Sequence, residues 1–118
     1  MSQLSEEELC KVAFVMAIKD ALNVVSGKWK LAIVCTMLSG PRRFNEMERL
    51  LSGLSSRMLA RELLVLEISG VVSRIVEAAP SRAAHSYALT EAGKRLENVI
   101  FSMADWGVEY RKLTATKG

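Results

Sequence analysis

The hydrophobic positions near the start of the chain recur at steps of three and four residues. This repeat belongs to one face of a helix, and its members are Val15, Ile18, Leu22 and Val25. Ser5 followed by Glu8 has the form of a capping box, and Ser26-Gly27 interrupts the pattern. These features predict a first helix over about residues 6–25. Further apolar residues widen its hydrophobic surface beyond one stripe, so we expect it to bury more than one face.

Two shorter helices are predicted next. Apolar residues keep the helical spacing over about residues 28–38, and Gly40-Pro41 ends that segment. Phe44 is expected to close a short extended link. Asn45 then has the residue type of a helix cap, so we expect a third helix from there through Leu51.

A turn and a fourth helix complete a helix-turn-helix. The Ser52-Gly53-Leu54 turn precedes Ser55, which is placed to cap a helix over about residues 55–69. Ser69-Gly70 ends this helix. Two helices joined by a tight glycine turn have the helix-turn-helix layout.

The C-terminal part predicts a hairpin and a long helix. Two short segments within about residues 71–89 are rich in strand-forming residues and flank a loop that contains Pro80. Thr90 is expected to cap a helix over about residues 90–113. Its apolar residues alternate steps of three and four, as in an a/d seam, and they are Leu96, Val99, Met103, Trp106, Tyr110 and Leu113.

The order of these elements predicts a winged helix-turn-helix, mainly α with a small β-hairpin and extra helices at both termini. A chain of 118 residues suits a single domain over residues 1–118. In this fold the second helix of the turn motif, here about 55–69, enters the DNA major groove. We call it the recognition helix, and we expect the hairpin, the wing over about 71–89, to lie on flanking DNA.

The terminal helices carry more apolar surface than one small domain core needs. We therefore predict a homodimer in which both terminal helices are buried and two recognition helices are paired. The residues expected at this interface are Val15, Ile18, Leu22, Val99, Met103, Trp106 and Tyr110. The alternative is that the two terminal helices cover each other within one chain.

The charge distribution favours a partner with phosphates. The net charge is only +3, yet residues 28–95 hold eleven basic residues against six acidic ones, whereas residues 1–27 are acidic. A basic centre between neutral or acidic ends suits a nucleic acid. A solvated basic face explains the charge alone equally well.

Several functional classes find no support in the sequence. The early apolar run, residues 12–18, is shorter than the roughly 20 residues that span a bilayer, so we expect no membrane segment. We expect no disulfide scaffold from Cys10 and Cys35, and we expect a reducing cytoplasm. His85 has no neighbouring ligands for a metal. We find no catalytic motif and expect neither an enzyme nor a cofactor.

Eight residues are candidates for contacts with double-stranded DNA, and they are Lys28, Arg42, Arg43, Ser55, Ser56, Arg57, Arg61 and Arg82. Arg57 and Arg61 are one turn apart on the expected outer side of the recognition helix, where an arginine fork pairs with guanine; a surface salt bridge, for example with Glu62, is the alternative. Ser55 and Ser56 begin that helix and suit a phosphate.

The other four candidates are expected at the DNA backbone. Arg82 in the wing suits a phosphate or the adjacent minor groove, and Arg42 a phosphate. Arg43 has an equally good structural explanation, which is to join the helix-turn-helix to the wing. The stem of Lys28 has the alternative of packing against Trp29.

A series of motifs resembles one known family. In order, they are Gly27-Lys28-Trp29, Arg43-Phe44-Asn45-Glu46, Ser55-Ser56-Arg57-Met58-Leu59, Gly70-Val71-Val72, Leu89-Thr90 and Trp106-Gly107. Over about residues 16–107 the chain resembles the HxlR-type winged-helix transcriptional regulators. The resemblance implies a homodimeric DNA-binding protein of bacteria or archaea, in a family where some members respond to oxidants or reactive electrophiles.

The cysteine positions depart from that family. Many members carry a cysteine twelve residues before the lysine of Gly-Lys-Trp, where this chain has Met16. Cys10 lies outside the motif. Cys35 is flanked by apolar residues, so we expect a buried structural thiol rather than a sensor.

The sequence thus predicts a sequence-specific DNA-binding transcriptional regulator. The rival function is a winged-helix protein-interaction module that binds DNA only without sequence preference. An apolar effector between the terminal helices and the core is a weaker alternative, because methionine and aromatic residues at helical spacing fill cores without a ligand. The residues that would line such a pocket are Phe14, Met16, Phe101, Met103 and Trp106.

Overall fold

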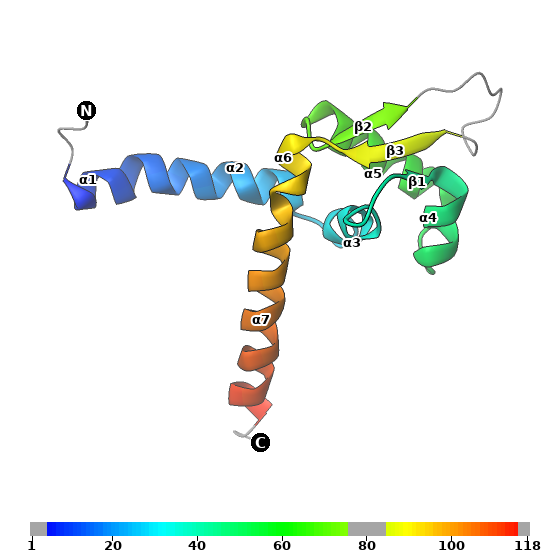
Figure 1. The fold of residues 1–118 in the computed structure, drawn as a ribbon. Coiled ribbons are helices and arrows are strands. Elements are labelled where there is room, and N and C mark those ends of the chain that lie inside the picture. Colours follow the sequence, from blue (N-terminus) through cyan, green and yellow to red (C-terminus); the bar gives the residue numbers. More distant parts are fainter. Residues whose placement is uncertain (1–4, 76–84, 116–118) are drawn as a thin grey trace.

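The computed structural model describes residues 5–75 and 85–115, and its N-terminal part is one continuous helical arm. This N-terminal arm consists of α1 (Glu6–Leu9), the π-helical turn η1 (Cys10–Phe14) and α2 (Val15–Val25). It projects from the rest of the molecule (Figure 1). The predicted first helix over about 6–25 is confirmed.

The next helix, α3 (Lys30–Thr36), is shorter than the predicted 28–38. Gly27 adopts a φ of 102°, a left-handed conformation that turns the chain between the arm and α3. At the other end, the Met37 N–H bonds the carbonyl of Val34, three residues earlier. This tighter bond replaces the α-helical pattern, so the helix ends early.

The helix-turn-helix consists of α4 (Phe44–Leu50) and α5 (Ser56–Ile68). Ser55 caps α5 as predicted, because its Oγ accepts the Met58 N–H at 3.1 Å. The prediction that Asn45 caps the preceding helix is wrong. Phe44 is already helical, and the backbone N–H of Arg43 donates to the Glu46 carboxylate at 2.7 Å, so Arg43 holds the cap position.

The small sheet has three antiparallel strands rather than two, in the order β1-β3-β2. The predicted hairpin corresponds to β2 (Val72–Ile75) and β3 (Ser86–Leu89), and the added strand is β1 (Arg42–Arg43). A two-residue strand has no periodicity that a sequence pattern can reveal. The loop over 76–84, which includes the candidate Arg82, lies outside the described residues.

Two helices, α6 (Glu91–Lys94) and α7 (Leu96–Ala115), replace the single predicted helix over 90–113. Thr90 caps α6 as predicted, since its Oγ1 accepts the Gly93 N–H at 3.1 Å. The same hydroxyl also donates to the Gly70 carbonyl at 2.6 Å. Gly93 has no space for a side chain, because a Cβ there would collide with the Val71 carbonyl oxygen. The start of α6 is therefore fixed against the end of α5.

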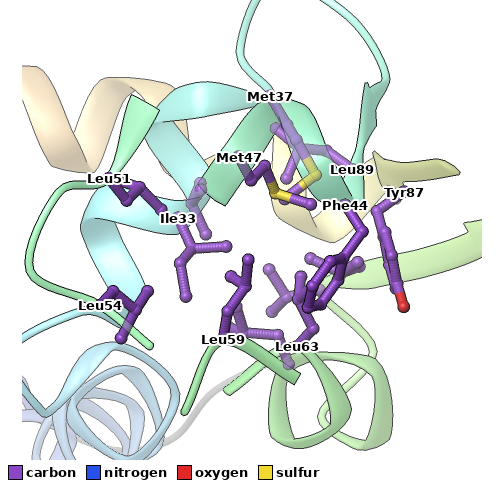
Figure 2. Packing of buried hydrophobic residues seen from close by; sticks show 14 residues of the cluster. Ile33, Met37, Phe44, Met47, Leu51, Leu54, Leu59, Leu63, Tyr87 and Leu89 are labelled. Atoms are coloured by element: carbon purple, nitrogen blue, oxygen red, sulfur yellow. The ribbon is translucent and has the colours of Figure 1, made fainter. Parts of the chain in front are cut away.

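The hydrophobic core lies between α3, α4, α5 and the sheet (Figure 2). Its most completely buried large side chains are Ile33, Val34, Met47, Leu59, Leu63, Leu66, Val72 and Tyr87. None of the buried core residues comes from the N-terminal arm or from α7. The terminal helices contribute to the confirmed winged helix-turn-helix only partly buried side chains packed against this core, which are Val24, Leu96 and Ile100.

The molecule is extended for its length. Its radius of gyration is 17.5 Å, whereas a compact domain of this size has about 13.5 Å. The difference arises because the N-terminal arm and α7 leave the winged helix in different directions (Figure 1). Within the ranges described, no helix has the combination of length and apolar character that crossing a bilayer requires.

Candidate nucleic-acid interface

The N-terminal half of α5 is presented to solvent on one side. Leu59 and Leu63 face the core, while Ser56, Arg57 and Arg61 are exposed. Arg57 and Arg61 are four residues apart and therefore lie on the same helical face. Among the described residues neither guanidinium forms an ion pair, so the predicted alternative of a surface salt bridge with Glu62 is not what the structure contains.

The two serines at the start of α5 already have partners within the chain. The Ser55 oxygen accepts the Met58 N–H and keeps its own hydroxyl proton available for a donor role. The Ser56 hydroxyl donates to the Glu48 carboxylate of α4. Of the two, Ser55 is thus the one whose hydroxyl hydrogen is free to donate to an external phosphate.

Glu62, the residue after Arg61, pairs with a lysine instead. Its carboxylate lies 2.9 Å from the Nζ of Lys30, at the start of α3, and both side chains are largely buried. Farther along α5, Glu67 lies 3.6 Å from the Nε of Arg74 on β2. Neither pairing was predicted from the sequence, where Glu62 precedes the core residue Leu63 and Glu67 follows the core residue Leu66.

Arg42 and Arg43 lie on β1 and not on a free loop. The Nε of Arg42 donates to the Thr36 carbonyl at 2.7 Å, which ties the strand to the end of α3. Arg43 is exposed and pairs in register with Ser86 of β3. Both arginines therefore contribute to joining the helix-turn-helix to the wing strands.

Lys28 precedes α3 and is exposed, with its Nζ 5.3 Å from the centre of the Trp29 ring. This cation–π contact brings the ammonium group to Trp29, the residue named in the alternative for Lys28. The Trp29 ring also lies against the turn of the helix-turn-helix, since a Cβ on Gly53 would be 3.8 Å from it. Lys28 is thus held beside that turn.

The seven residues predicted at a dimer interface are all exposed on the projecting helices. Their exposed fractions run from 42% for Val99 to 68% for Trp106. Trp106 and Tyr110 stack on each other within α7, with ring centres 4.9 Å apart. Because these side chains stay exposed, the alternative in which the terminal helices cover each other within one chain is wrong.

The residues expected to line an apolar pocket between the terminal helices and the core do not form one. The depression between α2, the end of α5 and the start of α7 is lined by other side chains, among them Ala21, Val24, Val71 and Leu96. The depression that includes Met103 and Trp106 is lined by α7 alone. Phe14 and Met16 lie on the N-terminal arm, which runs in another direction (Figure 1). The side chains named for this pocket do not converge.

The prediction made for Cys35 is wrong. It was predicted to be a buried structural thiol, but it is exposed on the outer side of α3, because Ile33, Val34 and Met37 provide the core face. Partial desolvation raises the pKa of the Cys35 thiol above its ordinary value. The thiolate, which is the reactive form, is therefore disfavoured there.

Comparison with known proteins agrees with this geometry. A family model described as HxlR-like helix-turn-helix matches residues 24–115. The HTH-type transcriptional regulator YdeP of Bacillus subtilis is 37% identical over 95 residues, which are 80% of this chain and 73% of the relative. An HTH-type transcriptional regulator of Methanothermobacter thermautotrophicus is 33% identical and covers 92% of this chain and 82% of its own length.

Solved structures show the same architecture. The redox regulator HypR in its reduced form is 34% identical, with a TM-score of 0.75 over 85% of this chain and 98% of its own. The relatives and the matching family are transcriptional regulators rather than enzymes.

Proposed function

Because the chain belongs to the HxlR-like helix-turn-helix family of transcriptional regulators, we propose that it binds specific DNA sequences as a homodimer. The proposal assigns base recognition to α5, with Arg57 and Arg61 in the major groove. The observation that carries it is the pair of exposed guanidinium groups, free of ion pairs, on one face of this helix. An arginine fork in the groove pairs with the O6 and N7 of guanine.

Contacts with the sugar-phosphate backbone are assigned to the elements beside α5. Ser55 and Ser56 lie at its N-terminus, and Lys28 lies beside the turn that precedes it. Arg42 and Arg43 on β1 and Arg82 in the wing complete the proposed set. Such contacts fix the position of the protein on the duplex but do not themselves distinguish sequences.

Homodimer formation is proposed through the N-terminal arm and α7. These helices expose apolar side chains that the core of the chain leaves uncovered. A two-fold axis between two copies would bury them and place two α5 helices in successive major grooves. The regulator would then recognise a palindromic site on cytoplasmic DNA.

The test is a selection of duplexes from a randomised DNA pool, followed by fluorescence anisotropy on the selected and scrambled sequences. We expect a selected site with two related half-sites about one helical turn apart, and a preference that survives near-physiological salt. Equal binding of all duplexes that disappears with salt would contradict the proposal and favour a protein-interaction module.

A further inference from the structure

Three side chains of α5 contact three different neighbouring elements. The contacts are Ser56 with Glu48 of α4, Glu62 with Lys30 of α3, and Glu67 with Arg74 of β2. They occur near the start, the middle and the end of the helix. The recognition helix is thus held along its length by polar contacts as well as by its core face.

The middle contact differs from the others in burial. Lys30 and Glu62 are 15% and 21% exposed, whereas the Arg74–Glu67 pair is about a third exposed on both sides. An exposed ion pair contributes little, because both groups remain well solvated. A largely buried pair requires both partners, since removing one leaves an uncompensated charge away from water.

The position of the pair connects two parts of the molecule. Lys30 is the first residue of α3, directly after the link that leaves the N-terminal arm. A Cβ on Gly27 in that link would be 3.6 Å from the Lys30 Nζ. On the other side, Glu62 follows Arg61 in the exposed half of α5. The ion pair therefore joins the base of the arm to the helix that carries the arginines.

The pair also determines where a negative charge lies. Without Lys30, the Glu62 carboxylate would be an unpaired anion one residue from Arg61. It would repel the phosphates of an approaching duplex. With Lys30 in place, the carboxylate is directed toward α3, and neither arginine forms an ion pair with a described residue.

We propose that Lys30 and Glu62 are positioning residues for DNA recognition, whose ion pair fixes α5, and with it Arg57 and Arg61, against α3. This inference rests on the proposed function of α5. Neither residue is proposed to contact DNA itself. Their effect is on the selectivity of the protein rather than on its general attraction to DNA.

The test is the double variant Lys30→Met/Glu62→Met. It removes one positive and one negative charge, so the net charge and the non-specific affinity for scrambled duplex are expected to stay the same. Replacing a buried pair by apolar residues of similar size commonly leaves the fold stable. The affinity for the selected site should fall about tenfold, as for the loss of one good bidentate base contact.

The matched control is Glu91→Met/Arg95→Met. It removes an ion pair of the same zero net charge, which is about four-fifths exposed and joins the first residue of α6 to its C-cap. Both affinities of this control should remain those of the wild type. Thermal melting of each variant is measured alongside, so that a change in selectivity is separated from unfolding.

The outcomes distinguish this inference from the function on which it rests. A folded double variant that keeps the wild-type ratio of specific to non-specific affinity overturns the role of the pair alone. A wild-type protein that prefers no sequence overturns the proposed function and this role together. If the double Met variant does not fold, the ratio of specific to non-specific affinity is measured instead for Lys30→Gln/Glu62→Gln, whose side-chain amides can still hydrogen-bond.

Discussion

Arg57 and Arg61 are the residues on which selectivity should depend most directly. Truncating Arg57 to alanine removes a fork that can pair with one guanine, so the affinity for the selected duplex should fall by about 1–3 kcal/mol, or roughly ten- to hundredfold. The affinity for scrambled DNA should change much less. Anisotropy titrations at one fixed salt concentration measure both quantities.

Arg95→Ala is the matched control for this change, because it removes the same charge from an exposed position on α6. Arg57→Lys adds a second comparison, since a lysine keeps the charge but lacks the planar fork. If Arg57→Ala and Arg95→Ala have the same effect on specific binding, Arg57 does not recognise a base.

Cys35 provides a prediction about reactivity. Its raised pKa means that less thiolate is present at pH 7 than for an ordinary cysteine, so alkylation should be slow. The rate should increase with pH until it levels off above the pKa of a free cysteine. The measurement is iodoacetamide labelling followed by mass spectrometry in a Cys10→Ser background, where Cys35 is the only thiol.

The control for Cys35 is free cysteine under the same conditions. Labelling faster than this control at pH 7 would contradict the prediction and indicate an activated thiol. Cys35→Ser should leave the affinity for the selected duplex unchanged, because the side chain lies on α3 and outside the proposed interface.

At the scale of helices and strands, the sequence predicted most where side chains repeat over several turns. The N-terminal arm and α5 were predicted to within a residue or so at each end, because their apolar spacing and caps agree. The two-residue strand β1 was missed. The cap of α4 was assigned to the wrong residue. The capping hydrogen bond is donated by the backbone N–H of Arg43 to the Glu46 carboxylate, and a backbone donor cannot be recognised from the residue type at the cap position.

The candidate interface was predictable only in part. Exposure of Arg57 and Arg61 follows from the helical period once the core leucines are known. The pairing of Lys30 with Glu62 joins residues 32 positions apart on two helices. Such a contact depends on how α3 and α5 pack, and no local pattern contains that information.

Thr90 links the start of α6 to the end of α5. Its hydroxyl caps α6 and also bonds the Gly70 carbonyl at the end of α5. Thr90→Val removes both bonds at nearly constant volume and should lower the free energy of unfolding by about 1–2 kcal/mol. Thr90→Ser retains the hydroxyl and is the control. Denaturant unfolding measures both, and equal stability of the two variants would show that the hydroxyl contributes nothing.

At the scale of the whole molecule, the terminal helices are the feature that the isolated chain leaves unexplained. The winged helix has its own core, and the radius of gyration of 17.5 Å reflects helices that extend away from it. Exposed apolar surface of this extent commonly marks an interface. Along both terminal helices the apolar residues recur at steps of three and four, which is the spacing that packing against another helix requires.

Val99→Glu tests whether this surface is where two copies meet. A carboxylate buried in an apolar interface has no compensating partner, so the variant should become monomeric. Because Val99 is exposed and lies outside the core, the variant should stay folded by circular dichroism. Light scattering coupled to gel filtration should then give twice the mass of one chain for the wild type and the mass of one chain for Val99→Glu.

The affinity of Val99→Glu for the two-half-site duplex should fall, while its affinity for an isolated half-site should not. Val65→Glu is the control for the oligomeric state, since Val65 is 40% exposed against 42% for Val99 but lies outside the terminal helices. A wild-type monomer, or a Val99→Glu variant that remains dimeric, would show that the terminal helices meet some other surface.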